Sequence, residues 1–400
     1  MDKAEVSSAV SDMPVSPAGR EYLHRPGVAY LNHGGFGSCP RPVFETYQHW
    51  QRELAAQPTE FLSRRLSGLL AEARERLAAY VGTQADNLVF VPNATHGVNI
   101  VARSLRLGPE DEVLLTSHEY GAVERTWRFL CGQNGAQYRV QPIPLPVTSQ
   151  DALVEQLWAG VTPRTRVLVI SHITSPTALI FPLEAICRRA AEAGILTVID
   201  GAHAPGQVDL HLDALGADFY SGNCHKWLCA PVGAGFLYAR PERQVLLHPL
   251  VVSWGWDARA PGASQFQDFF EWTGTHDPAA YLSVPAAIAF QEEHHWQQVR
   301  RDCHQLAGQA LQRIADLTGL EHISPDSTEW WGQMCAIPLP ITDKAAANAL
   351  KSALWDTYQV EVPIVDWQER FFVRVSIQAY NTPRHVDRLV DALTHLLTDT

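Results

Sequence analysis

A single lysine, Lys226, lies in the stretch YSGNCHKWLCAP (Tyr220–Pro231), between a histidine and a tryptophan. Burial disfavours the charged form of a lysine, and a neutral amine is a nucleophile that forms a Schiff base with a carbonyl group. Alternatively, a half-buried lysine packs its aliphatic stem and extends its ammonium group into water. Taken by itself, the stretch favours this structural interpretation, so a catalytic one needs support from other residues.

A carboxylate precedes this lysine by 26 residues, because the apolar run ILTVID ends at Asp200. An aspartate at the end of a buried strand is costly unless a cationic group meets it. A protonated pyridine nitrogen, an arginine or a metal ion would each satisfy the carboxylate.

A third polar group follows the β-rich run NLVFVPN, which leads into Ala94 and Thr95 at the start of a helical segment. The N–H groups and dipole of a helix N-terminus bind anions, although an ordinary N-cap is the commoner use of these residue types. Pyridoxal phosphate requires an aspartate, a Schiff-base lysine and a phosphate site. The aspartate keeps the pyridine nitrogen protonated, so that the ring accepts electrons from the substrate Cα.

Other kinds of site have weaker support. The glycines at Gly34–Gly37 and Gly233–Gly235 lack the GxGxxG spacing of a nicotinamide site. The segment DLHLD (Asp209–Asp213) alternates possible metal ligands, but a solvated loop edge explains it better, and we expect no metal. The pair His294–His295 lies in a polar helical setting that is typical of a surface.

The middle of the chain alternates two kinds of segment that could position these groups. The expected strands are NLVFVPN, DEVLLTS, RVLVISHI, ILTVIDGAH, ADFYSGN and GAGFLYAR, and the helices between them include THGVNIVARSLR, GAVERTWRFLCGQNG and PLEAICRRAAEAG. Unbroken apolar strands separated by amphipathic helices predict a mostly parallel sheet with both faces covered. Ligands bind such sheets beyond the carboxyl ends of the strands.

The pattern changes after about Asp257, where a turn-rich segment leads into a long helical one and then into mixed strands and helices. We therefore expect a large α/β domain over 30–284 and a smaller α+β domain over 285–400. The first 29 residues are expected to form a leader that joins the small domain.

Composition excludes several classes of protein. The net charge is -12 and the sequence contains no basic run, so we expect no nucleic-acid partner. The seven cysteines are scattered and form no CxxC pair, which suits a reducing compartment. No apolar run approaches the roughly 18 residues of a membrane span, and the N-terminus lacks a signal-peptide core. We expect a soluble, cytoplasmic protein.

Nine motifs between Tyr30 and Thr382 resemble those of one enzyme family. They are YLNHGGFGSCPRPV, NATHGVN, SHEYGAV, SHITSPTALI, VIDGAHAPGQVDL, DFYSGNCHKWLCAP, SWGW, WTGTHDPAAYLSVPAAI and VRVSIQAYNT. The chain resembles the class V, fold-type I pyridoxal-phosphate enzymes. Within them it is most similar to the isopenicillin N epimerase-like branch, which includes cysteine desulfhydrase-like C–S lyases. The resemblance implies a fold-type I architecture, with a mostly parallel seven-stranded sheet in the large domain.

The resemblance assigns the cofactor site by position. It implies that Lys226 is the Schiff-base lysine, that Asp200 meets the pyridine nitrogen and that His203 lies near the phenolic oxygen. The resemblance also places Tyr120 and Ser175 against the cofactor. Tyr120 replaces the histidine that stacks on one cofactor face in desulfurases, and Ser175 stands where desulfurases carry an asparagine against the phenolic oxygen.

Further assignments concern the phosphate, the dimer and the substrate. Thr95 and the N–H groups of Ala94 and Thr95 should bind phosphate, helped by Asn223 and His225. Thr275 resembles a phosphate contact that comes from the other subunit, which implies a homodimer. Two residues, Arg374 and His33, are expected to bind the amino-acid substrate, with Arg374 on its α-carboxylate.

The motifs identify the reaction less specifically than they identify the cofactor. The stretch TYQVEVPIVDWQERFFVR contains no cysteine where desulfurases present one, so we expect no persulfide chemistry of that type. We expect an epimerase or racemase first, a β-eliminating C–S lyase second and an aminotransferase third. A racemase needs a second acid–base group, and the candidates are Tyr120, His33 and His276. A catalytically idle relative is disfavoured because Lys226, Asp200 and Arg374 are all present.

Overall fold

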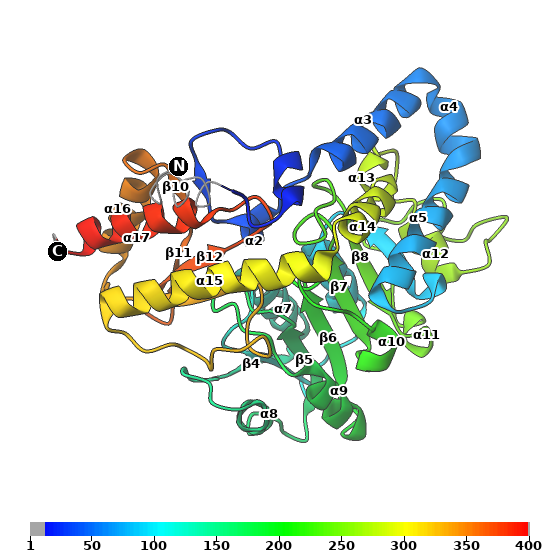
Figure 1. Cartoon of the computed structure of the whole chain (residues 1–400). Coiled ribbons are helices and arrows are strands. Elements are labelled where there is room, and N and C mark those ends of the chain that lie inside the picture. The colour runs from blue at the N-terminus through cyan, green and yellow to red at the C-terminus, as the bar shows by residue number, and fades with distance from the viewer. Residues whose placement is uncertain (1–12, 399–400) are drawn as a thin grey trace.

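A sheet of seven strands forms the centre of the molecule in the computed structural model, which describes residues 13–398 (Figure 1). In spatial order the strands are β2 (Leu88–Val91), β8 (Gly235–Ala239), β7 (Phe219–Asn223), β6 (Leu196–Gly201), β5 (Thr165–Ser171), β3 (Glu112–Thr116) and β4 (Gln137–Gln141). β8 runs antiparallel to both of its neighbours, β2 and β7, and the remaining pairs in this sheet are parallel. The predicted mostly parallel seven-stranded sheet is therefore confirmed.

Helices cover both faces of this sheet, because alternate residues of its strands point into two separate cores. Val167 and Val169 belong to one core, and Leu168 and Ile170 belong to the other. The first core is completed by α6 (Ala94–Ser104), α7 (Gly121–Asn134) and α12 (Gln265–Phe270). The second includes α3 (Arg41–Ala56), α5 (Leu66–Val81), α8 (Gln150–Trp158), α9 (Leu183–Glu192), α10 (Leu212–Leu215), α13 (Ala279–Leu282) and α14 (Val284–Glu293).

Capping residues set the ends of several of these helices. The Asn93 side chain accepts the N–H of His96 and begins α6, and Asp343 caps α16 (Lys344–Asp356) in the same way. Gly82 ends α5 in the left-handed conformation that glycine adopts without strain. Shorter elements are η1 (Pro17–Glu21), α2 (His33–Phe36), α4 (Pro58–Glu60), η2 (Phe61–Arg65), η3 (Ala85–Asn87) and α11 (Pro241–Gln244).

A smaller antiparallel sheet has the order β11 (Ile364–Trp367), β12 (Arg370–Ser376), β9 (Met334–Leu339). The long helix α15 (Trp296–Thr318) packs against β9 and α17 (Pro383–Thr398), and Figure 1 shows it in yellow. Near the N-terminus, β1 (Ala29–Tyr30) pairs in parallel with β10 (Val360–Glu361). The N–H groups of Val15 and Ser16 donate to the carbonyls of Asn381 and Ala379, which follow β12, whereas 1–12 of the expected leader lie outside the described residues.

The packing partners of the chain change between α14 and α15. α14 packs on α3 and α5, whereas α15 packs mainly on β9 and α17. This change lies close to the expected boundary between 284 and 285, and the division into domains stays a prediction. Across residues 13–398, no helix combines the length and apolar character that crossing a bilayer requires.

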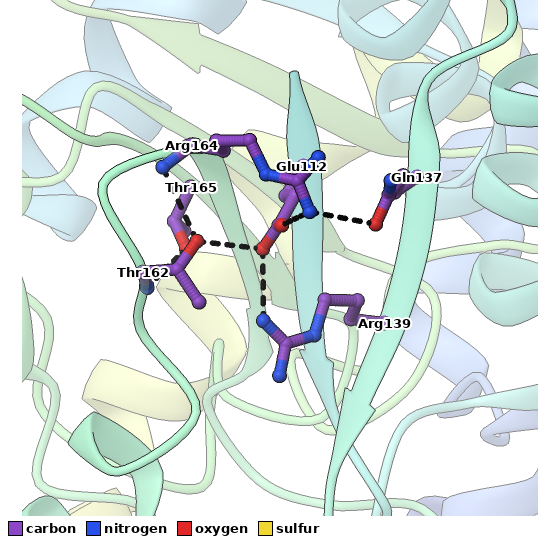
Figure 2. A network of polar contacts seen from close by, with 6 residues as sticks. All are labelled: Glu112, Gln137, Arg139, Thr162, Arg164 and Thr165. Carbon is purple, nitrogen blue, oxygen red and sulfur yellow. Dashed lines mark hydrogen bonds and ion pairs between the residues drawn. The ribbon is translucent and has the colours of Figure 1, made fainter. Parts of the chain in front are cut away.

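The amino ends of the central strands are joined by a buried carboxylate, Glu112, whose exposed fraction is 1% (Figure 2). Glu112 lies 2.9 Å from Arg139 Nη1 and 2.5 Å from Arg164 Nη2, and it accepts a hydrogen bond of 2.8 Å from Thr162. Burial alone would raise the pKa of Glu112, but the hydrogen bonds and the two arginine charges outweigh it and lower the pKa. This network connects the amino ends of β3 and β4 with the turn before β5, on the side of the sheet opposite the carboxyl ends.

Candidate active site

A cavity of about 440 Å³ lies beyond the carboxyl ends of β5, β6 and β7, where an open α/β sheet is expected to bind its ligand. Nine residues expected at the site line it: Ala94, Thr95, Tyr120, Ser175, Asp200, His203, Asn223, His225 and Lys226. The four others that the sequence singled out, His33, Thr275, His276 and Arg374, do not line the cavity of this single chain.

The loop that carries Lys226 follows β7 and folds back on itself. The N–H of Cys224 donates to the carbonyl of Ala234, and the N–H of Ala230 donates to the carbonyl of Cys224. Two glycines let other segments approach this loop closely. A Cβ on Gly37 would lie 1.8 Å from the carbonyl oxygen of His225, and one on Gly206 would lie 2.2 Å from that of Trp227. Both glycines have positive φ, so a side chain there would also strain the backbone.

The half-buried amine of Lys226 lies 3.2 Å from His203 Nε2. Burial lowers the pKa of Lys226 to about 8; the positive charge of Arg374 acts in the same direction, and the carboxylate of Asp200 opposes both. Near neutral pH a useful fraction of this amine is therefore unprotonated and nucleophilic.

Asp200 ends β6 with a carboxylate that is only 4% exposed. Its Oδ1 accepts the N–H of Ala202 at 2.9 Å, and among the described residues it forms no ion pair within 4 Å. Burial raises the pKa of Asp200, although the Ala202 N–H and the charge of Lys226 partly offset this effect. A cationic group in the cavity would complete the site.

Arg374 reaches the same region from β12 of the smaller sheet. Its Nη1 donates to the carbonyl oxygen and to the hydroxyl of Ser175, at 2.6 and 3.0 Å, and Ser175 lines the cavity. The buried Nε has no hydrogen-bond partner among the described residues. Burial lowers the pKa of Arg374 to about 10, against a raising effect from Tyr120. A buried guanidinium with an unused donor is suited to a carboxylate.

His33 lies behind the lysine instead of in the cavity. It is fully buried, its Nε2 lies 3.1 Å from the carbonyl oxygen of Lys226, and its Nδ1 lies 3.1 Å from the hydroxyl of Tyr380. Burial lowers the pKa of His33 to about 3. The geometry gives His33 a contact with the backbone of the lysine and no contact with the cavity.

The segment with Thr275 and His276 precedes α13, and neither residue lines the cavity of its own chain. Thr275 is exposed, and His276 Nδ1 lies 2.8 Å from the carbonyl oxygen of Gly274.

Sequence reasoning missed several residues around the cavity. Phe36 and Val232 line it with 74% and 73% of their surface exposed. Glu119, beneath the cavity, accepts hydrogen bonds from Ser171 and Thr116, both at 2.6 Å, and burial raises its pKa to about 8. Exposed apolar side chains and a buried carboxyl carry no distinctive sequence signal, because only the folded chain reveals their surroundings.

The amino-acid sequence matches the Aminotransferase class-V family over residues 29–389. The chain belongs to this family. It is 39% identical to an isopenicillin N epimerase of Amycolatopsis lactamdurans, over 93% of this chain and 96% of that protein. It is 30% identical to a putative L-cysteine desulfhydrase of Oryza sativa subsp. japonica, over 94% of this chain and 84% of that protein.

The three-dimensional fold is also similar to that of solved structures. The structure of a cysteine desulfurase from Thermococcus onnurineus superposes with a TM-score of 0.82 at 18% identity, covering 96% of this chain and 99% of that one. The fold-type I architecture expected from the motifs is thereby confirmed. As a class-V aminotransferase family member, the chain uses pyridoxal 5'-phosphate as its cofactor.

The nitrogen end of the cavity fits this cofactor. Asp200 is a buried carboxylate that lacks a cationic partner among the described residues, and a protonated pyridine nitrogen supplies one. Lys226 lies in the same cavity with a lowered pKa, as an aldehyde-binding amine requires. The donor set therefore agrees with the chemistry of the group.

The phosphate end fits in part. The N–H of Ala94 already donates to Asn223 Oδ1 at 2.7 Å, so the expected direct role of this N–H in phosphate binding requires Asn223 to turn away. Thr95 lines the cavity at the start of α6, where the helix dipole favours an anion. His225 Nδ1 lies 3.1 Å from the carbonyl oxygen of Ala234 and carries the proton between them. Its Nε2 can therefore donate to phosphate only when the ring is protonated.

Proposed function

We propose that the chain is a pyridoxal-phosphate enzyme that epimerises or racemises an amino acid at Cα. The observation that carries the enzyme class is the presence of Lys226 and Asp200 in one cavity at the carboxyl ends of the central strands. Epimerisation is favoured by the 39% identity to an isopenicillin N epimerase along almost the whole of both chains.

In this proposal each residue of the cavity has a distinct task. Lys226 holds the cofactor aldehyde and then moves the Cα proton, which its lowered pKa supports. Asp200 keeps the pyridine nitrogen protonated, and His203 donates to the phenolic oxygen. When bound, the cofactor supplies an electron sink for negative charge at the substrate Cα. Thr95 and Asn223 bind the phosphate group, and His225 contributes a donor only when its ring is protonated.

Arg374 is proposed to bind the substrate α-carboxylate. The unpaired Nε supports this role, and its bonds to Ser175 hold the guanidinium in one orientation. Ser175, which also lines the cavity, thereby orients Arg374.

Epimerisation requires a second proton donor on the substrate face opposite Lys226. Of the three candidates, only Tyr120 lines the cavity, and 45% of its surface is exposed. We assign the second acid–base role to Tyr120. Its position also allows the ring to cover one face of the cofactor.

The active form is proposed to be a homodimer in which Thr275 binds the phosphate of the partner subunit. Thr275 is exposed and does not line the cavity of its own chain, which supports this arrangement. A cytoplasmic location is supported by the seven cysteines, all of which are free thiols.

The second candidate is β-elimination by a C–S lyase, which the 30% identity to a putative L-cysteine desulfhydrase favours. Proton NMR in heavy water separates the two reactions, with added cofactor and a panel of L-amino acids that includes cysteine and S-alkyl cysteines. Loss of the Cα proton signal from an otherwise intact amino acid, followed by detection of the D-form, is the result expected of an epimerase. Release of pyruvate with a thiol or sulfide would replace it with the lyase.

A further inference from the structure

Three side chains form a continuous chain of hydrogen bonds that ends at the proposed cofactor lysine. The indole Nε1 of Trp227 donates to His203 Nδ1 at 3.2 Å, and His203 Nε2 lies 3.2 Å from Lys226 Nζ. Trp227 and His203 are 0% and 3% exposed, so water does not replace these partners. The tryptophan is thus adjacent to the lysine in sequence and also connected to it through a third residue.

The direction of the first hydrogen bond determines the direction of the second. An indole N–H is only a donor, so Nδ1 of His203 must accept and carry no proton. Burial and the neighbouring charge of Lys226 lower the pKa of His203 well below its usual value, so the ring is neutral and its single proton lies on Nε2. An Nε2–H group faces the lysine, and it can donate only to an unprotonated amine.

We propose that Trp227 is a positioning residue that fixes His203 in the Nε2–H tautomer, so that His203 is a donor toward the lysine amine and the phenolic oxygen of the cofactor. This inference rests on the proposed function for the use of the amine, but the tautomer itself can be tested without any turnover. It assigns a function to Trp227 that its burial alone does not require.

The packing around Trp227 holds the indole in this orientation. The indole ring lies 5.0 Å from the ring of His33, and a Cβ on Gly34 would lie 3.2 Å from it, so α2 covers the indole closely. The carbonyl of Trp227 accepts a hydrogen bond of 2.8 Å from Gln291 on α14. Because α2 and α14 both fix Trp227, the indole N–H has little freedom to turn away from His203.

Other charged and titratable groups also act on the lysine amine. Arg374 on β12 disfavours its protonation and Asp200 on β6 favours it. His225 and His33 are both neutral at pH 7, since burial lowers their pKa values to about 4 and about 3. All four of these groups remain in place in a Trp227→Phe variant, and the phenyl ring keeps an aromatic neighbour for His33, so the variant mainly reports the contribution of the tautomer.

The first test substitutes Trp227→Phe, which keeps an aromatic ring and removes the N–H. Without the indole donor, His203 can place its proton on Nδ1 and accept a hydrogen bond from a protonated Lys226. We expect the Lys226 pKa to rise by about 1 unit or more in the variant. The measurement is the pH dependence of Lys226 acetylation by acetic anhydride in the full chain freed of cofactor, read by peptide mass spectrometry.

The matched control is Trp127→Phe. Trp127 is also 0% exposed, but its indole N–H has no partner among the described residues, and it lies in the core on the other face of the central sheet. This control should lose packing without changing the Lys226 pKa. An unchanged Lys226 pKa in Trp227→Phe would overturn the proposal.

The second test needs no Trp227 variant and therefore remains informative if that variant does not fold. The full-length protein is labelled with ¹⁵N-histidine, and the His203 signals are assigned by their loss in His203→Gln. Nitrogen NMR with and without cofactor should show a protonated Nε2 and an unprotonated Nδ1. A proton on Nδ1 would refute the inference even if the epimerase activity were found, and a failed activity assay would leave this result untouched.

Discussion

At the scale of single residues, the site depends on charged groups whose pKa values burial has shifted from their ordinary values. Lys226 and Arg374 have lowered pKa values and Asp200 has a raised one, and burial is the largest cause in each case. Groups with such shifts in one region are typical of catalytic sites. Each of them can be tested by substitution.

Lys226→Ala should abolish the covalent attachment of the cofactor, because no other described lysine lines the cavity. Reduction with borohydride, followed by peptide mass spectrometry, should identify the adduct on Lys226 in the unaltered protein and none in the variant. Circular dichroism should show that the variant folds. Lys351→Ala, an exposed position on α16, is the control and should retain the adduct. An adduct on another lysine would refute the assignment.

The rate at which the cofactor-free protein binds pyridoxal phosphate should depend on pH. The Lys226 pKa is lowered to about 8, so the unprotonated, reactive fraction of the amine is small well below this pH and nearly complete above it. The rate constant should rise with pH and become constant above about pH 8, as followed by absorbance in a stopped-flow instrument. A profile that keeps rising to pH 10 would mean that the pKa is not lowered.

Arg374→Ala should raise KM for α-amino acids about 10- to 100-fold, since a lost charge-assisted hydrogen bond costs about 1.5–3 kcal/mol. Cofactor content should change little, which absorbance of the purified protein reports. The control is Arg370→Ala on the same strand, an exposed arginine that lies over Phe372. Equal KM values in Arg374→Ala and the unaltered protein would assign the carboxylate to other residues.

At the scale of secondary-structure elements, the two ends of the central strands have different functions. The carboxyl ends hold the candidate site, whereas the amino ends are held by Glu112 and its partners on β4 and the turn before β5 (Figure 2). The contacts of the Glu112 carboxylate with two arginines and a threonine offset the energetic cost of its desolvation. The amino ends of the strands can therefore be altered without touching the groups of the candidate site.

Glu112→Gln should lower the free energy of unfolding by about 1–3 kcal/mol, because it removes a buried charge from two partly exposed arginines. Since the folded pKa of Glu112 is lowered, its contribution is present above the unfolded pKa and is lost as pH falls through the folded value. Urea titrations at pH 7 and at acid pH should therefore show a smaller difference between variant and unaltered protein in acid.

The control for Glu112 is Glu155→Gln, at an exposed ion pair with Arg189 where 69% of the glutamate side chain is accessible. Surface pairs of this kind contribute about 0–1 kcal/mol, so the control should differ little from the unaltered protein. Equal losses in both variants would mean that the buried network gives no special stability.

At the scale of the whole molecule, the candidate site is assembled from the large sheet, the smaller sheet and, in our proposal, a second subunit. Arg374 and Ser175 meet although they are separated by 199 residues. The smaller sheet therefore contributes the guanidinium group of Arg374 to the candidate site. A partner that supplies Thr275 would extend the same principle to the dimer.

A mixed dimer tests this arrangement. Lys226→Ala should be inactive because it lacks the amine, and Thr275→Asp should be inactive because its carboxylate repels the cofactor phosphate of the partner. Mixing and reassembling the two variants creates one site with both residues intact, so activity should reappear. Thr273→Asp, in the same loop, is the control and should be active alone. No recovery in reassembled dimers would show that Thr275 acts elsewhere.

The sequence alone determined the alternation of strands and helices and the residues at strand ends. Asp200 and the lysine loop were predictable because parallel strands end at one edge of the sheet, so groups that follow them converge. The motif VRVSIQAYNT also identified Arg374. These signals are local, and local patterns of apolar and polar residues survive in the folded chain.

Only the tertiary structure decided which of these groups meet. His33 contacts the backbone of Lys226 from behind, the N–H of Ala94 is already bonded to Asn223, and Trp227 reaches Lys226 through His203. Each of these contacts joins segments that are far apart in the sequence, except for the neighbouring Trp227 and Lys226. The direction of a side chain and the partner of each donor depend on how such segments pack, which no local pattern encodes.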